Sequence, residues 1–138
     1  MLLDTHVWLA FVDGDRRRIG LRARRALDRA AGRGELSLSA VSVFELMALE
    51  LSGRIQLAMP VQTWIRESIN RLGCRLHDVT SAVAIDAGLI SSSALADPFD
   101  RLIAATANML ALPLVTRDER ILDYARSSQR LRVVDARR

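Results

Sequence analysis

Two aspartates follow short apolar runs of the sequence that are typical of buried strands. Asp4 comes directly after Met1 to Leu3, and Asp118 comes after Leu114 to Thr116 with one residue between. In an open α/β sheet, binding sites form beyond the carboxyl ends of the strands, at the point where the strand order reverses. If these two strands are neighbours, we expect the carboxylates of Asp4 and Asp118 to lie close together.

Glu45 is a third candidate, because it lies in a stretch of mostly apolar residues from 41 to 51. A helix that is apolar on nearly all sides is expected to be buried. A buried carboxylate is unfavourable unless a cation or a hydrogen-bond donor meets it, and no residue nearby in the sequence provides one. Glu50 lies near the end of the same stretch and is expected to be the better solvated of the two.

Asp97 and Asp100 complete the set of acidic candidates. They lie three residues apart at the start of the clearest helical pattern in the chain, so they share its first turn. Asp100 is in line with Ile103, Ala104 and Ala107, a stripe of small and apolar residues that is expected to face the sheet. The carboxylate of Asp100 is therefore predicted to point inward.

Each of these aspartates also has an ordinary structural explanation. Asp97 precedes a proline and is a favourable N-cap, while Asp100 can complement the dipole of the same helix. Asp4 and Asp118 can likewise cap the helices that follow them. These alternatives stay open for each residue taken alone, and Glu45 is the hardest to explain in this way.

The combination of Asp4, Glu45, Asp100 and Asp118 favours a metal site. Converging carboxylates repel one another strongly unless a divalent cation lies among them, and the sequence contains no Lys to offset their charge. Oxygen-rich sites favour Mg²⁺ or Mn²⁺ over softer metals. Such ions activate water and hold a phosphate for in-line displacement. The expected chemistry is therefore hydrolysis of a phosphodiester bond.

The elements that would position these residues alternate along the chain between short strands and helices. This alternation is typical of an α/β domain with a parallel sheet and helices on both faces. The sequence has no internal repeat and no linker, so residues 1–138 are expected to form one domain. Strands are expected at residues 1–3, 36–40, 74–79, 113–116 and 131–135, and helices at 5–12, 20–31, 41–51, 60–72, 80–90, 98–110 and 119–125.

The composition excludes several classes of enzyme. All 20 cationic side chains are Arg. A P-loop NTPase, a Schiff-base enzyme and a protein kinase each need a Lys, so the chain is none of these. Half of the residues are apolar and 26% are charged, which suits a folded domain. The formal net charge of +4 is weak evidence for an acidic partner such as a nucleic acid.

The sequence also indicates the cellular compartment in which the protein is expected. A single cysteine, Cys74, excludes an intrachain disulfide and a zinc-ribbon cluster, and a reducing setting is the default for such a chain. No apolar run approaches the length of a membrane span, and no signal peptide is evident. We therefore expect a cytoplasmic protein with no membrane contact.

Arg18, Arg22, Arg25 and Arg29 follow one another at helical spacing and are predicted to form one basic stripe. The stripe could hold an RNA backbone by charge, or it could be a solvated helix face. No aromatic residue is interleaved with it, which argues against base stacking there.

Other side chains have weaker signals. His6 could ligate a metal ion or assist proton transfer, although a histidine satisfied by structural contacts is the more usual case. Trp8 and Trp64 lie at helical apolar spacing and are expected in the core or in a dimer contact. Cys74 has no base near it in the sequence and is interpreted as a buried small hydrophobe.

At the acidic residues, the sequence resembles the PIN-domain ribonucleases, and among them the VapC-type toxins of bacterial toxin–antitoxin pairs. The matching stretches occur in the family's order and spacing and together cover essentially the whole chain. The combination of LLDTHVWL with DPFDRLIAATA is specific for this family. The stretches are LLDTHVWL (residues 2–9), SAVSVFELMAL (39–49), DPFDRLIAATA (97–107) and LVTRDERI (114–121).

The resemblance implies a three-layer α/β/α fold with a mainly parallel central sheet. It further implies cleavage of RNA to 5′-phosphate and 3′-hydroxyl ends with Mg²⁺ or Mn²⁺, frequent homodimerisation, and inhibition by a co-expressed VapB-like antitoxin. Asp4 and Asp100 would be the most direct metal ligands, and Glu45 and Asp118 would complete the site partly through water.

Two further positions match the family pattern. Asp97 is usual at the metal site of this subgroup, with a role that is less defined than those of the quartet. Thr116 matches a polar position before the last aspartate and would hydrogen-bond a carboxylate or a metal-bound water.

Two other interpretations compete with a metal-dependent endoribonuclease. An aspartyl phosphatase of the haloacid dehalogenase type also has an aspartate after its first strand, but its pattern needs a second aspartate at position 6 and a Lys. This sequence has His6 and no Lys. The remaining alternative is a non-catalytic RNA- or protein-binding module of the same fold whose acids are structural.

Overall fold

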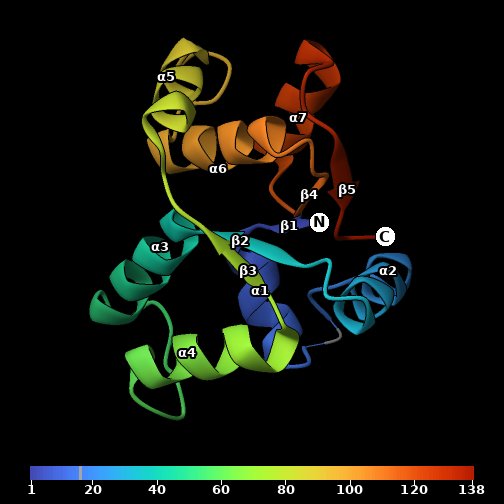
Figure 1. Ribbon diagram of the computed structural model, residues 1–138, viewed down its shortest axis with the longest axis vertical. Helices are drawn as coiled ribbons and strands as arrows, with labels where there is room; N and C mark the ends of the chain where they lie inside the picture. The colour runs from blue at the N-terminus through green and yellow to red at the C-terminus, as the bar shows by residue number, and fades with distance from the viewer. Residues whose placement is uncertain (16) are drawn as a thin grey trace.

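The chain folds around one sheet of short strands. In the computed structural model, which describes residues 1–15 and 17–138, all pairings in this five-stranded sheet are parallel and the strand order is β3-β2-β1-β4-β5 (Figure 1). This confirms the parallel sheet that the alternation of strands and helices predicts. It also agrees with the mainly parallel sheet that the family resemblance implies. The strands are β1 (Leu2–Leu3), β2 (Ser37–Ser39), β3 (Arg75–His77), β4 (Leu114–Thr116) and β5 (Val133–Asp135).

The described part of the chain contains seven helices, each close to a range that the sequence predicts. None of them is both long and apolar enough to cross a membrane. The helices are α1 (Thr5–Val12), α2 (Leu21–Gly32), α3 (Ala40–Leu51), α4 (Val61–Leu72), α5 (Ser81–Leu89), α6 (Pro98–Met109) and α7 (Glu119–Ser128).

Successive strand residues point to opposite faces of the sheet, so the apolar strands feed two cores. Leu3 and Val115 are fully buried on the face covered by α1, α2 and α4. Leu2 and Leu114 are fully buried on the other face, against α6 and α7. The two helical layers lie on either side of the sheet (Figure 1), which confirms the three-layer α/β/α arrangement.

The tryptophans and the cysteine lie in or near the first of these cores. Trp8 and Trp64 are both buried, with ring centroids 5.2 Å apart, so they are core residues. Cys74 is only half-buried, which is less than predicted, and burial raises the pKa of its thiol to about 11. The thiol is therefore protonated at neutral pH and is a poor nucleophile.

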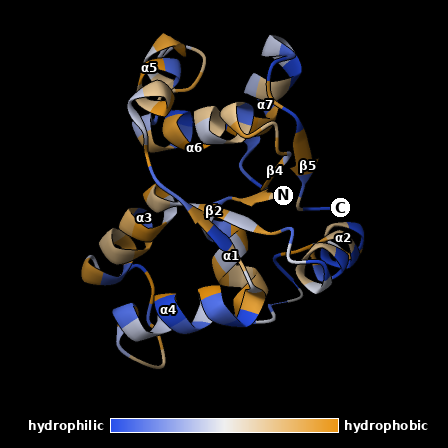
Figure 2. Cartoon of the chain, viewed as in Figure 1, coloured by the Kyte–Doolittle hydropathy of each residue, from blue (hydrophilic) through white to orange (hydrophobic). Residues whose placement is uncertain are grey.

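Helix α3 is less buried than its apolar sequence predicts. Phe44 is 58% exposed and Leu51 is 78% exposed, whereas Leu46 is fully buried. The reason is that α3 contacts α1, α4 and α6 along part of its surface, and the outer part of this apolar helix faces solvent (Figure 2). The prediction of a helix buried on nearly all sides is therefore wrong.

Helix α2 begins one residue later than predicted. Gly20 is extended, with φ −64° and ψ 158°, and its N–H donates to the carbonyl of Ala136 at 2.8 Å. Arg18 precedes both the predicted and the observed helix, and its guanidinium lies 3.2 Å from the carboxylate of Asp15. The predicted basic stripe is correspondingly shorter on the helix itself, where its exposed members are Arg22, Arg25 and Arg29.

The strand order reverses next to β1. From β1 the chain builds outward through β2 and β3, and it then returns to place β4 on the opposite side of β1. The register pairs Leu2 with Leu114 and Leu3 with Val115. The carboxyl ends of β1 and β4 therefore lie side by side at the switch point, where ligands bind in folds of this type.

Candidate active site

Asp4 lies at this switch point, directly after β1. Its carboxylate is 4% exposed and accepts a hydrogen bond from the hydroxyl of Thr116, with an Oγ1–Oδ2 distance of 2.6 Å. Asp4 occupies the N-cap position of α1, yet its side chain makes no capping hydrogen bond. The capping role that remained open from the sequence therefore does not explain this carboxylate.

Thr116 joins Asp4 to Asp118. The Thr116 hydroxyl donates to Asp4 and accepts from the backbone N–H of Asp118 at 3.0 Å, so both of its hydrogen-bonding functions are used. One oxygen of Asp118 accepts from the N–H of Arg120 at 2.7 Å and caps α7. Asp118 is therefore an N-cap, as the structural alternative holds, and it also lies close enough to raise the pKa of Asp4.

Glu45 reaches the same place from α3. Its Oε2 accepts a hydrogen bond from the hydroxyl of Thr5, the first residue of α1. The donor that the sequence does not show locally is thus supplied from 40 residues away. Sequence reasoning missed Thr5 because no short-range pattern links it to Glu45.

Helix α6 brings Asp97 and Asp100 to the cluster. Asp97 caps the helix by accepting from the N–H of Phe99 at 2.8 Å, as the structural alternative predicts. Asp100 follows in the first turn and is half-buried, in line with the fully buried Ile103 and Ala104. The inward orientation predicted for Asp100 is consistent with this burial.

The electrostatics show that these acids share one environment. Burial raises the pKa of Asp100 to about 7, and the neighbouring carboxylates of Asp97, Asp4, Asp118 and Glu45 add to the rise. Each of the other four predicted acids thus lies close enough to Asp100 to raise its pKa.

Burial also raises the pKa of Asp4 and of Glu45. In each case a hydrogen bond from a threonine lowers the pKa and offsets part of this rise. Within the described chain, no arginine forms an ion pair with any acid of the cluster. Arginine therefore does not neutralise these acids in the described residues, and the imidazole of His6 is the side chain whose charge lowers the pKa of Asp4 and of Glu45.

The donor set suits a hard divalent cation that keeps part of its water. Among residues 1–15 and 17–138, no three Asp, Glu, His or Cys side chains form a ready-made ligand cage for one ion. Mg²⁺ is usually bound through one or two carboxylates, with waters and substrate phosphates filling the remaining positions. Buried, mutually repelling carboxylate oxygens fit such an ion.

A cavity of about 430 Å³ adjoins the cluster. It is open between α1, α3 and the start of α6, and two acids of the cluster form part of its wall. His6 is exposed there, which does not fit the interpretation of a histidine satisfied by structural contacts. Residues that line the cavity include His6, Glu45, Leu49, Arg54, Asp97 and Phe99.

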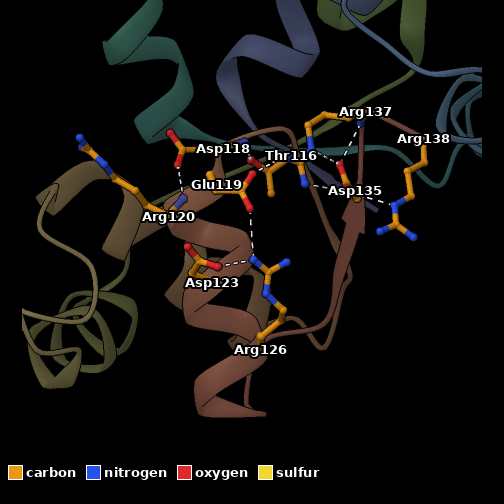
Figure 3. A network of polar contacts seen from close by, with 9 residues as sticks. All are labelled: Thr116, Asp118, Glu119, Arg120, Asp123, Arg126, Asp135, Arg137 and Arg138. Atoms are coloured by element: carbon orange, nitrogen blue, oxygen red, sulfur yellow. Dashed lines mark hydrogen bonds and ion pairs between the residues drawn. The ribbon is translucent and has the colours of Figure 1, made fainter.

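A different group of acids lies at the end of β5 and on α7 (Figure 3). Asp135 accepts hydrogen bonds from the guanidinium of Arg137, and Arg137 also pairs with Glu119. Arg138 lies 3.5 Å from Asp135. These hydrogen bonds from Arg137 lower the pKa of Asp135 to about 2. Here the protein neutralises its own acids.

Comparison with known proteins agrees with this geometry. The family model of the PIN domain matches residues 1–127. The chain belongs to the PIN domain family. This confirms the resemblance seen in the sequence.

A curated relative of this PIN domain is Ribonuclease VapC22 of Mycobacterium tuberculosis. The two are 39% identical over 127 residues, which is 90% of this chain and 91% of the relative. A match of this extent places the PIN domain with the VapC-type members of its family.

Solved structures share the fold of this PIN domain. One is VapBC2 from Rickettsia felis bound to a DNA fragment from its promoter, with a TM-score of 0.69, 14% identity, and coverage of 97% of this chain and 96% of that chain. Another is a toxin–antitoxin complex from Klebsiella pneumoniae, with a TM-score of 0.57, 18% identity and 85% of both chains covered. At such identities these likenesses establish the fold alone.

Proposed function

We propose that this PIN domain is a metal-dependent endoribonuclease toxin that hydrolyses RNA phosphodiester bonds with Mg²⁺ or Mn²⁺. The observation that carries the proposal is the cluster of one buried and several half-buried carboxylates at the switch point of the sheet, which has no arginine partner among the described residues. Structural acids are normally paired or solvated, so this arrangement favours a cation-binding role. The name of the relative, Ribonuclease VapC22, supports RNA as the substrate.

The roles of the acids are those that the family resemblance implies, and their positions support them. Asp4 and Asp100 would hold the ion directly, because Asp4 is buried and Asp100 half-buried in the cluster, and neither uses its carboxylate as a helix cap. Glu45 and Asp118 would complete the site partly through water, and Asp97 would add charge while it caps α6. When bound, the ion would supply an activated water and a counter-charge for the phosphate.

The threonines position the acids. Thr116 fixes the orientation of Asp4, and Thr5 fixes that of Glu45, so both carboxylates are oriented before substrate arrives. Such preorganisation reduces the rearrangement needed during the reaction. Attack of water on the phosphorus, with departure of the 3′-oxygen, leaves a 5′-phosphate and a 3′-hydroxyl.

Cleavage of RNA by the wild-type protein and by Asp4→Asn tests the proposal. We expect wild type to cleave RNA with Mg²⁺ and to lose activity in EDTA, while Asp4→Asn is inactive and still folded. Equal cleavage by both proteins would remove Asp4 from the site. An inert wild type that still binds RNA would support the alternative of a non-catalytic binding module.

We also propose that this PIN domain pairs with a second copy and with a VapB-like antitoxin. Its structural neighbours are named as VapBC and toxin–antitoxin complexes, which supports the antitoxin. The outer face of α5 supports the dimer, because Ile85 is 67% exposed and Leu89 is 76% exposed one helical turn apart. Light scattering should give twice the chain mass for wild type and a lower mass for Ile85→Asp.

A further inference from the structure

The cavity beside the acidic cluster has a location that restricts what can occupy it. Glu45 and Asp97 belong both to the cluster and to the cavity wall. A group in the cavity therefore lies directly next to the place where a phosphate would react. If the proposed function holds, that group belongs to a nucleotide adjoining the cleaved bond.

The chemistry of the wall suits a planar heterocycle. Its apolar part includes Leu49 and the ring of Phe99, and its polar part includes the imidazole of His6 and the guanidinium of Arg54. The volume of about 430 Å³ lies within the range of roughly 300–1,000 Å³ that is usual for small-molecule sites. Apolar walls with a few polar groups are how proteins hold bases.

The aromatic residues of the chain are distributed in a way that supports this assignment. Trp8, Trp64 and Tyr124 are buried and belong to the core. Phe44 and Phe99 meet beside the cluster, with ring centroids 5.3 Å apart at an angle of 43°. Phe44 is 58% exposed, and Phe99 is partly buried against the core that includes Leu2 and Leu114. Aromatic faces near solvent at a nucleic-acid site are stacking platforms for unpaired bases.

Arg54 adds charge complementarity. It is exposed, lines the cavity together with Glu45 and Asp97, and forms no ion pair with any residue that the structure describes. A cation that lines the same cavity as the acids can hold the backbone phosphate of the bound nucleotide, which the carboxylates would otherwise repel. The cavity thus offers separate places for a base and for its phosphate.

We propose that this cavity binds one unpaired nucleobase of the RNA substrate, next to the cleaved bond, with Phe99 as its aromatic wall and Arg54 as the ligand of the adjoining phosphate. The inference rests on the proposed function. A base within a duplex is stacked on both faces and cannot enter a cavity of this kind. The PIN domain therefore selects RNA that is single-stranded at the cleavage site.

The test compares intact and abasic substrates. A short single-stranded RNA that wild type cleaves at one position is remade with an abasic nucleotide on either side of that position in turn. One abasic placement is expected to lower kcat/KM for wild type by about tenfold or more, since stacking of one base contributes on this scale. A duplex of the same sequence should be cleaved more slowly than the single strand.

Variants locate the effect in the cavity. Phe99→Ala should lower kcat/KM on intact RNA by about tenfold and have little further effect on the sensitive abasic RNA. Phe99→Leu keeps the apolar contact and removes the aromatic face, so it should behave similarly if stacking is the cause. Arg54→Ala should weaken binding, whereas Arg66→Ala, on the exposed side of α4, should not.

The outcomes separate this inference from the proposed function. Equal losses by Phe99→Ala on intact and abasic RNA, or cleavage that is insensitive to both abasic placements, would overturn the base site while leaving the nuclease in place. No cleavage of any RNA by wild type would instead overturn the proposed function. Thermal unfolding of each variant shows whether α6 is intact, and binding of intact and abasic RNA to Asp4→Asn protein repeats the comparison without catalysis.

Discussion

Two groups of acids lie near the carboxyl edge of the same sheet, and their electrostatic environments are opposite. At the end of β5, Asp135 is held by Arg137, which lowers its pKa to about 2. At the switch point, Asp100 is half-buried among other carboxylates, and its pKa rises to about 7. The first arrangement stabilises the charged carboxylate, whereas the second disfavours it, because burial and neighbouring acids favour the protonated form.

This difference distinguishes structural acids from functional ones in this molecule. Both groups are acidic and both lie near strand ends, so residue type and position alone do not separate them. Their partners do, because the β5 group pairs with arginines (Figure 3), whereas the hydrogen bonds that the cluster accepts within the described residues come from hydroxyls and backbone N–H groups. An uncompensated cluster reduces stability and persists where function requires it.

The sharpest way to test this contrast is to neutralise one acid from each group. Asp100→Asn should abolish metal-dependent cleavage, by more than about a hundredfold, since loss of even an outer contact at a metal site costs 10- to 100-fold. The same change should raise the Tm of the metal-free protein because it removes a carboxylate repelled by its neighbours. RNA cleavage and thermal unfolding in EDTA measure the two effects.

Asp135→Asn is the matched change in the other group. It removes the acceptor of Arg137 and should lower the Tm while leaving cleavage near the wild-type rate. Opposite signs of the two shifts in Tm are the expected result. A loss of stability in Asp100→Asn equal to that in Asp135→Asn would show that Asp100 is structural.

Thr116 provides a smaller effect within the cluster. Thr116→Val keeps the shape but removes the donor to Asp4 and the acceptor of the Asp118 N–H, so we expect activity to fall about 10- to 100-fold. Thr116→Ser retains the hydroxyl and should preserve most of the activity. Full activity in the valine variant would mean that Asp4 is oriented by other contacts.

The two groups also predict the pH dependence of stability. Folding raises the pKa of Asp100 from its ordinary value of 3.8 to about 7, so the folded state binds more protons between these values and stability falls as pH rises through that window. The raised pKa values of Asp4 and Glu45 act in the same direction. Asp135 acts in the opposite direction, because folding lowers its pKa from 3.8 to about 2. Its contribution to the free energy of unfolding is lost only as the pH falls through this range.

Urea unfolding in EDTA at pH 5 and at pH 8 measures this dependence. The metal-free protein should be more stable at pH 5, and Asp100→Asn should reduce the difference. Saturating Mg²⁺ should stabilise the protein more at pH 8, because the ion binds the deprotonated acids. A metal-free protein that is more stable at pH 8 would contradict the assigned direction.

The smallest effect is expected for Arg126 on the outer face of α7. Its guanidinium pairs with Glu119 and Asp123 (Figure 3), but all three side chains are more than half exposed. Exposed ion pairs contribute little because water and salt screen them. Arg126→Ala should leave cleavage unchanged and shift the unfolding midpoint hardly at all, which a denaturation curve checks against Asp135→Asn.

The parts of the site set by local patterns could be predicted from the sequence. Asp4 and Asp118 follow apolar strands, and strand ends meet at a switch point in a parallel sheet. Asp100 shares a helix face with small apolar residues, which indicated its burial. The helices were also predictable, because their apolar spacing and capping residues are short-range features.

The remaining features depend on contacts between distant segments. Glu45 meets the hydroxyl of Thr5 only after α1 and α3 pack together. The exposure of Phe44 depends on which neighbours α3 has, and its apolar sequence alone suggested burial. Gly20 is extended because it bonds to Ala136 at the far end of the chain, so the start of α2 was misplaced.

The hydrogen bond between Thr116 and Asp4 joins residues 112 positions apart. During translation, β4 leaves the ribosome long after β1, so the cluster is incomplete on most of the growing polypeptide. A polypeptide that ends before β4 therefore lacks both Thr116 and Asp118 and cannot assemble the cluster.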